Sequence, residues 1–310
     1  MSIITLQNGN SIAETFEDFI LAKRAKGLRS KTLFSYVCHF KSVSKHLDVE
    51  QDIVNLCKSD LDKMVASMRE TGLSANSINS YTKLMKSFLS WCNTEGITPL
   101  TISIYRGEET VKDTYTDQEL EKLLKKPDTR KCGFCEYRDW VIVNFLLNSG
   151  SRAATVRAIQ IRDVDLENGM VHYRHTKNNK AQVIPLCSDM VRILREYLRF
   201  RGGADTDTLF CSDTGEPLTE NALRKGIVRY NKSRGVQKTS IHLFRHTFAR
   251  KYLIDCGGDA FTLQKILGHS TLEMTKHYCA VFNADIVKNY DNFSPLAQMC
   301  HKEERIKMKR

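Results

Sequence analysis

The sequence has 310 residues, of which 41% are hydrophobic and 27% are charged. This composition is typical of a soluble globular protein, and the length is sufficient for two domains. No apolar run approaches the roughly 18 residues of a membrane span, and the N-terminus lacks the basic and apolar regions of a signal peptide. We therefore expect a cytoplasmic protein and exclude a membrane protein.

The formal net charge of +11 is concentrated in the C-terminal part of the chain. Residues 1–110 hold 13 Lys and Arg against 12 Asp and Glu, a net charge of +1, whereas residues 111–310 hold 34 against 24, a net charge of +10. A basic surface favours phosphate backbones because binding releases counterions. Charge alone leaves open a basic protein that has no nucleic-acid partner.

Ten cysteines are scattered through the chain and do not form the dense framework of a small secreted domain. Cys132-Gly-Phe-Cys135 is the only Cys-x-x-Cys motif, and no second pair of ligands lies at zinc-site spacing. The sequence also lacks the Gly-x-x-x-x-Gly-Lys-Ser/Thr nucleotide loop. We therefore expect reduced thiols, no metal and no cofactor.

Residues 12–95 are predicted to form an all-helical unit with Ser30 and Ser74 as helix caps. Gly27, Gly72 and Gly96 fall where the helical patterns stop, as is typical of glycines that end helices. Four apolar stripes at helical spacing are interpreted as core. They comprise Ile12, Phe16, Phe19 and Ile20; Leu33, Phe34, Val37 and Phe40; Leu61, Met64, Val65 and Met68; and Ile78, Tyr81, Leu84, Met85 and Phe88.

The pattern then predicts a boundary between domains. Pro99 and the polar run Arg106-Gly-Glu-Glu109 interrupt the helical periodicity. Thr116-Asp-Gln-Glu119 has the spacing of a capping box and opens a new apolar run. We predict a first domain over residues 1–98, a linker over 99–113, a second domain over 114–298 and a basic tail over 299–310.

The second domain is predicted to be helical except for one small sheet. Tyr137 to Leu147 reads as a buried helix that ends at Asn148-Ser-Gly150. Residues 162–186 alternate between apolar and polar around turns, which predicts a small antiparallel sheet with a lysine-bearing turn. The predicted fold class is therefore mainly α with a small antiparallel β-sheet.

Six polar residues of this domain are of the types that metal-free cleavage of a phosphodiester needs. Two arginines can bind the non-bridging oxygens of one phosphate, and two histidines can donate hydrogen bonds or move protons. A lysine in a turn suits proton delivery to a departing 5′ oxygen, and a tyrosine hydroxyl can attack phosphorus. The candidate catalytic residues are Arg152, Lys177, His242, Arg245, His269 and Tyr278.

The local contexts of these residues are specific. Arg152 follows Asn148-Ser-Gly-Ser, and Lys177 lies in Thr-Lys-Asn-Asn-Lys before Val-Ile-Pro-Leu186. His242-Leu-Phe-Arg245 precedes Leu267-Gly-His269, which stands nine residues before Tyr278. Over nearly the whole chain, the order and contexts resemble the tyrosine recombinase family, which includes the Xer recombinases, Cre and the integrases of phages and mobile elements.

The resemblance implies a fold and a reaction. The first domain resembles a SAM-like core-binding domain, which forms a DNA clamp together with the α+β catalytic domain. The six residues imply cleavage and rejoining of DNA through a 3′-phosphotyrosyl intermediate, without metal or ATP. The implied partners are double-stranded DNA with inverted-repeat core sites, a homotetramer on paired sites, and accessory DNA-bending or directionality factors in a bacterial nucleoid.

The resemblance also leaves some residues and roles open. Thr155 stands where the family often has a Glu. Lys180 is a rival to Lys177 and is expected to contact a backbone phosphate, and His246 is expected to act in packing and supporting hydrogen bonds rather than in catalysis. The tail stripe of Phe282, Ile286, Val287 and Tyr290 either docks on a neighbouring subunit or packs within its own chain.

We favour integration and excision of a mobile element as the biological role, with Xer-type resolution of chromosome or plasmid dimers as the alternative. The closest enzymatic alternative is a type IB topoisomerase, which uses similar chemistry to relax DNA without exchanging strands. The separate helical N-terminal unit, the chain length and the Leu267-Gly-His269 motif favour a recombinase. A catalytically inactive DNA-binding protein is the alternative from another class, and the six intact positions argue against it.

Overall fold

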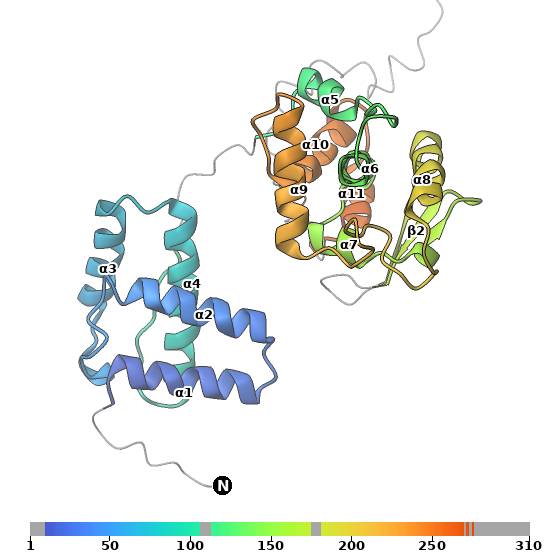
Figure 1. Cartoon of the computed structure of the whole chain (residues 1–310). Coiled ribbons are helices and arrows are strands. Elements are labelled where there is room, and N and C mark those ends of the chain that lie inside the picture. Colours follow the sequence, from blue (N-terminus) through green and yellow to red (C-terminus); the bar gives the residue numbers. More distant parts are fainter. Residues whose placement is uncertain (1–9, 106–112, 175–180, 270, 273–274, 276–310) are drawn as a thin grey trace, which may run out of the picture. The chain divides into compact units, whose positions relative to one another are not determined.

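The structure, a computed structural model, describes residues 10–105, 113–174, 181–269, 271–272 and 275 (Figure 1). By its contacts the chain divides into two compact units, Met1–Thr110 and Val111–Arg310. The division falls within residues 99–113. Within the described parts of the chain, no helix is both long and apolar enough to cross a membrane.

The N-terminal unit consists of helices. They are α1 (Ile12–Ala25), α2 (Ser30–Val43), the short 3₁₀ helix η1 (Ile53–Asn55), α3 (Lys58–Glu70) and α4 (Ala75–Thr94). A complete capping box starts α1, because the Ser11 hydroxyl accepts from the backbone N–H of Glu14 while the Glu14 carboxylate accepts from that of Ser11. Ser74 caps α4 as predicted. Ser30 does not cap α2, because the helix already starts at this residue and Arg29 precedes it.

The core of this unit is rich in aromatic side chains. Phe16 stacks on Phe40 with ring centroids 3.8 Å apart, and Phe19 and Phe88 are fully buried beside them. The prediction that Phe34 and Val37 belong to the core was wrong, since they are 70% and 49% exposed. The side of α2 that faces the core instead carries residues spaced three and four apart, namely Leu33, Tyr36, Phe40 and Val43.

The C-terminal unit has seven described α-helices and one small sheet. The helices are α5 (Asp117–Leu124), α6 (Phe134–Ser149), α7 (Ala153–Ala158), α8 (Ser188–Arg201), α9 (Glu220–Ser233), α10 (Ile241–Ile254) and α11 (Ala260–Leu267), with a 3₁₀ helix η2 (Ile161–Asp163) after α7. The strands are β1 (Val164–Asp165), β2 (Met170–Tyr173) and β3 (Gln182–Pro185), antiparallel in the order β1-β2-β3. The predicted fold class, mainly α with a small antiparallel sheet, is confirmed.

Helix α6 is the centre of this unit. It packs against α5, α8, α9 and α10, and Figure 1 shows it between α8 and the pair α9 and α10. Apolar residues lie all round the helix, as expected when neighbours cover every side. Because α6 ends at Gly150, this packing fixes the position of the segment that leads to Arg152.

Candidate active site

Arg245 lies at the centre of the site. It is only 6% exposed and lies one turn after His242 on α10. Its Nη1 donates to the carbonyl oxygen of Gly150 at 2.8 Å, and its Nη2 donates to the carbonyl oxygen of Leu267 at 2.9 Å. The arginine therefore joins three segments that are far apart in the sequence.

Both acceptor carbonyls belong to helix C-termini. Gly150 ends α6 with a φ of +60°, and Gly268 follows Leu267 at the end of α11 with a φ of +61°. The last carbonyls of a helix lack intrahelical partners and carry partial negative charge, so they suit a buried guanidinium. A Cβ on Gly150 would lie 2.5 Å from Cδ1 of Phe248, so the close approach of α6 to α10 requires glycine here.

His269 follows the second glycine and contacts the same arginine. Its Nε2 lies 2.7 Å from Nη2 of Arg245, and its Nδ1 lies 2.9 Å from Oγ1 of Thr275. The backbone N–H of His269 donates to the carbonyl of Gln264 at 3.0 Å. The end of α11 thus holds the imidazole against the guanidinium.

Arg152 approaches the same point from α7. It is the residue before the helix, is half-buried, and its Nη1 lies 3.5 Å from the carbonyl oxygen of Leu267. This contact is long and hence weak. Two guanidinium groups therefore converge on the carbonyl oxygen of Leu267, and the imidazole of His269 lies against one of them. The N–H donors of guanidinium groups suit the oxygens of a phosphate.

A chain of hydroxyl groups supports the backbone before Arg152. The Ser149 hydroxyl lies 2.7 Å from the Ser151 hydroxyl, which also contacts the hydroxyl of Tyr173 at the end of β2. Burial raises the pKa of Tyr173 to about 12, so its hydroxyl stays protonated near neutral pH. These bonds join the Arg152 segment to the strand that leads towards Lys177.

Strand β3, which pairs with β2 to form a hairpin, is joined to α11. Nε2 of Gln182, the first residue of β3, donates to the carbonyl of Ile266 at 2.8 Å and also to that of Lys265. Both carbonyls belong to the last turn of α11, directly before Leu267 and Gly268. Each strand beside residues 174–181 is therefore attached to a segment that carries a predicted catalytic residue.

Direct contacts bring together three of the six predicted residues, namely Arg152, Arg245 and His269. His242 lies one turn before Arg245, while Lys177 and Tyr278 lie outside the described residues. Thr155, where the family often has a Glu, is buried in α7. The acceptors of Arg245 are the backbone carbonyls of Gly150 and Leu267, which are present whichever side chain stands at position 155.

Sequence reasoning missed Thr275 and Gln182. Thr275 stands three residues before Tyr278, which would place both on one face of a helix, and this spacing was an available signal. Gln182 had no local signal, because its partner carbonyls are 83 and 84 residues away.

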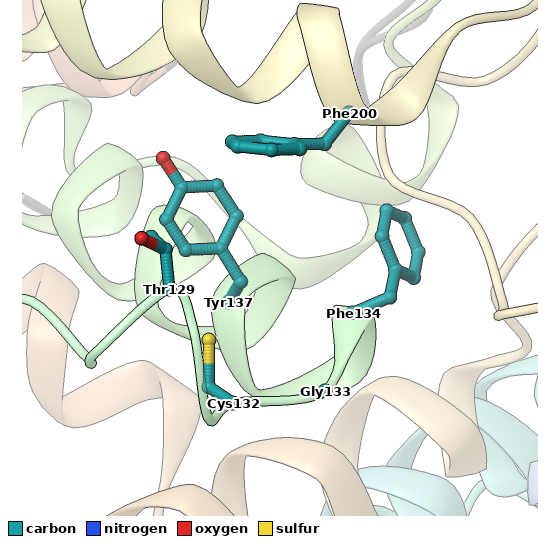
Figure 2. A pocket seen from close by; sticks show the side chains of 6 residues that line it. All are labelled: Thr129, Cys132, Gly133, Phe134, Tyr137 and Phe200. Atoms are coloured by element: carbon teal, nitrogen blue, oxygen red, sulfur yellow. The ribbon is translucent and has the colours of Figure 1, made fainter.

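A pocket of about 250 Å³ lies away from these residues, beside the start of α6. Figure 2 shows the rings of Phe134, Tyr137 and Phe200 around it. The remaining lining residues are Thr129, Cys132 and Gly133, and none of the six predicted catalytic residues is among them. Elsewhere in the described part of the chain, no cluster of three or more His, Cys, Asp or Glu could hold a metal ion.

Comparison with known proteins decides the family. A model of the phage integrase family matches residues 114–284, and a model of the phage integrase N-terminal SAM-like domain matches residues 14–96. The chain belongs to the phage integrase family. The predicted resemblance to tyrosine recombinases is confirmed, and the chain is a site-specific DNA recombinase of the tyrosine type.

Named relatives and solved structures agree with this assignment. The recombinase is 29% identical over 300 residues to tyrosine recombinase XerD of Staphylococcus haemolyticus, with 93% of this chain and 99% of the relative covered. It is 25% identical to tyrosine recombinase XerC of Thermodesulfovibrio yellowstonii, with 89% and 94% covered.

The fold is shared with two solved integrases. The Tn1549 transposon integrase in complex with transposon right end DNA superposes with a TM-score of 0.76 at 19% identity, with 92% of this recombinase and 99% of that chain covered. A lambda integrase dimer bound to a core site superposes with a TM-score of 0.71 at 16% identity, with 97% and 81% covered.

Proposed function

We propose that this recombinase cleaves DNA by attack of the Tyr278 hydroxyl on a phosphodiester, and that Arg152, Lys177, His242, Arg245 and His269 complete the catalytic set. The observation that carries the proposal is the buried guanidinium of Arg245, held by the carbonyls of Gly150 and Leu267 beside Nε2 of His269. A preorganised cation of this kind stabilises the charge that develops on a phosphate in the transition state.

The proposed reaction needs no external energy source. The Tyr278 hydroxyl gives its proton to a histidine of the catalytic set, and its oxygen forms a bond to phosphorus as the bond to the 5′ oxygen breaks. Lys177 delivers a proton to the leaving oxygen. The 3′-phosphotyrosyl link conserves the phosphodiester bond energy. Attack by a 5′ hydroxyl of another strand then releases the tyrosine and rejoins the DNA. The two arginines bind the non-bridging oxygens during both steps.

The proposed partner is double-stranded DNA with inverted-repeat core sites, on which four protomers assemble around two paired sites. The net charge of +10 over residues 111–310 supports binding to phosphate backbones. A lambda integrase of the same fold has been solved as a tetramer bound to a Holliday junction. Accessory DNA-bending or directionality factors, and an association with the bacterial nucleoid, belong to the same proposal.

For the biological role, we propose integration and excision of a mobile element. The fold shared with the Tn1549 transposon integrase and the Ser-Gly-Ser-Arg152 sequence followed by Thr155 support this role. Resolution of chromosome or plasmid dimers is the second candidate, and the similarity to XerD and XerC recombinases favours it.

The decisive experiment is the capture of the covalent intermediate on a nicked suicide substrate made from DNA that flanks the gene. We expect Tyr278→Phe to bind this DNA without forming an adduct, while the control Tyr290→Phe forms the adduct as the wild type does. An undiminished adduct with Tyr278→Phe would contradict the proposal. Mapping the cleavage position to the ends of a mobile element, or to a chromosomal dimer-resolution site, separates the two roles.

A further inference from the structure

The imidazole of His269 is held on both sides by groups of different chemistry. Nε2 faces Nη2 of Arg245 at 2.7 Å, and Nδ1 faces the hydroxyl oxygen of Thr275 at 2.9 Å. Arg245 is 6% exposed and Thr275 is completely buried. The half-buried ring is therefore fixed between a cation and a hydroxyl, both of which are themselves shielded from solvent.

The partner of Nε2 decides where the ring carries its proton. An arginine stays charged and its N–H groups can only donate, so Nε2 must accept. A neutral imidazole that accepts at Nε2 carries its hydrogen on Nδ1, and this hydrogen then points at Oγ1 of Thr275. A hydroxyl oxygen can accept that bond, so one tautomer fits both of these contacts of the ring.

The location of Thr275 gives this bond a mechanistic meaning. The backbone N–H of Thr275 donates to the carbonyl of Leu272 at 2.8 Å, which fixes the residue in a turn. Tyr278 follows three residues later in the sequence. The bond between His269 and Thr275 thus joins the phosphate-binding cations to the segment that carries the proposed nucleophile.

We propose that Thr275 is a positioning residue for strand cleavage: it holds His269 as the Nδ1–H tautomer and keeps Nε2 turned towards Arg245. The inference rests on the proposed function and names a residue that acts through His269. Without the hydroxyl, the Nε2–H tautomer becomes accessible, and its hydrogen points at the N–H of Arg245. Two N–H groups that face each other repel. This repulsion moves the guanidinium away from the position in which the ends of α6 and α11 hold it.

Three variants isolate the hydroxyl. Thr275→Val keeps the shape and removes the acceptor, while Thr275→Ser keeps the acceptor and removes a methyl group. Thr271→Val is the matched control, since Thr271 is exposed and lies in the same segment. Thermal unfolding and DNA affinity of each variant establish that the fold and the DNA-binding surface are intact.

The first measurement is made on the DNA-free protein. Long-range proton–nitrogen correlation spectra of the histidine side chains report the tautomer, and the spectrum of His269→Gln assigns the signals. We expect a protonated Nδ1 and a bare Nε2 in the wild type, Thr275→Ser and Thr271→Val, and a mixture in Thr275→Val. A protonated Nε2 in the wild type overturns the proposal, even if Thr275→Val does not fold.

The second measurement is the single-turnover rate of cleavage on the suicide substrate. We expect Thr275→Val to be slower by roughly 10–100-fold, the range found for groups that orient metal-ligating histidines. Thr275→Ser should restore most of the rate, and Thr271→Val should cleave like the wild type. Cleavage by Thr275→Val at the wild-type rate overturns the proposal.

The two measurements also separate this inference from the proposed function. The spectra need neither DNA nor catalysis, so they stand even if the nucleophile is not Tyr278. If Tyr278→Phe still forms an adduct, the proposed function fails while the tautomer remains measurable. If Tyr278→Phe forms no adduct and Thr275→Val retains the wild-type spectrum, only the role of Thr275 fails.

Discussion

At the scale of single residues, the main feature is a buried cation held by backbone atoms. Arg245 donates to the carbonyls of Gly150 and Leu267 and contacts His269 with the same planar group. Burying a charge is costly unless it is hydrogen-bonded, and these contacts provide the compensation. The fork of a guanidinium matches this arrangement, whereas an ammonium acts as a point charge.

We therefore predict that Arg245→Lys folds but cleaves poorly. One ammonium group on a narrower stem cannot reproduce the geometry of two guanidinium nitrogens. Removing a preorganised donor commonly costs about 10²–10³ in rate, and we expect a loss in this range. The measurement is single-turnover cleavage, with Arg250→Lys as the control, because Arg250 is exposed on the same helix. A near wild-type rate for Arg245→Lys would exclude a bidentate role.

Arg152 is expected to be equally necessary, although its contact with Leu267 is longer. We predict that Arg152→Ala loses cleavage by about the same factor while the folded state is maintained, since its side chain is only half-buried. Circular dichroism and the adduct assay test the two parts of this prediction. If the variant recombines at nearly the wild-type rate with its fold intact, Arg152 is not a phosphate ligand.

At the scale of elements, the site is built from the ends of helices. The C-termini of α6 and α11 supply the carbonyls. A glycine with positive φ caps each of these ends, Gly150 after α6 and Gly268 after α11. This geometry turns the chain sharply, so the last carbonyls of α6 and α11 face α10. The hairpin is attached to the same helix ends through Tyr173 and Gln182.

Gly150→Ala tests the helix end. Alanine would pay the cost of a left-handed conformation, about 1–2 kcal/mol, and its Cβ would press on Phe248 and Leu267. The matched control is Gly235→Ala, which has a φ of +72° but no atom within 4 Å of the added Cβ. Chemical denaturation should show a larger loss of unfolding free energy for Gly150→Ala. Equal losses would show that Phe248 and Leu267 adjust freely.

Gln182→Met tests the link between the hairpin and α11. Methionine has a similar length and no donor, so the bonds to Lys265 and Ile266 are lost. Because the site is partly exposed, we expect a stability loss of only about 1 kcal/mol. The cleavage rate should fall further in Gln182→Met than in Val183→Ala, which is the control at an exposed position of β3. If both variants cleave alike, the link does not position the hairpin.

At the scale of the whole molecule, two compact units differ in charge and in chemistry. The first is nearly neutral, while the predicted catalytic residues and a net charge of +10 belong to the second. The proposed reaction relies on arginine, lysine and histidine side chains for charge stabilisation. We therefore expect cleavage to proceed at an unchanged rate in EDTA and without ATP. A requirement for magnesium in single-turnover cleavage would refute this mechanism.

Local patterns in the sequence determined the elements. The apolar spacing of α1 and α4 and the capping boxes at Ser11 and Thr116 act within a few residues, so they can be read without a tertiary structure. The candidate site was also named from short motifs, His242-Leu-Phe-Arg245 and Leu267-Gly-His269. Phe34 shows the limit, because its exposure depends on how α2 packs against its neighbours.

The tertiary structure decided what holds the site together. The acceptors of Arg245 are backbone carbonyls 95 and 22 residues away, and a carbonyl is present in every residue, so no residue type announces them. The contact of Gln182 with α11 and the choice of Thr275 as the partner of His269 depend in the same way on packing. Residue types determined which groups can do the chemistry, whereas the packing of α6, α10 and α11 determined how they are oriented, because orientation depends on contacts between distant segments.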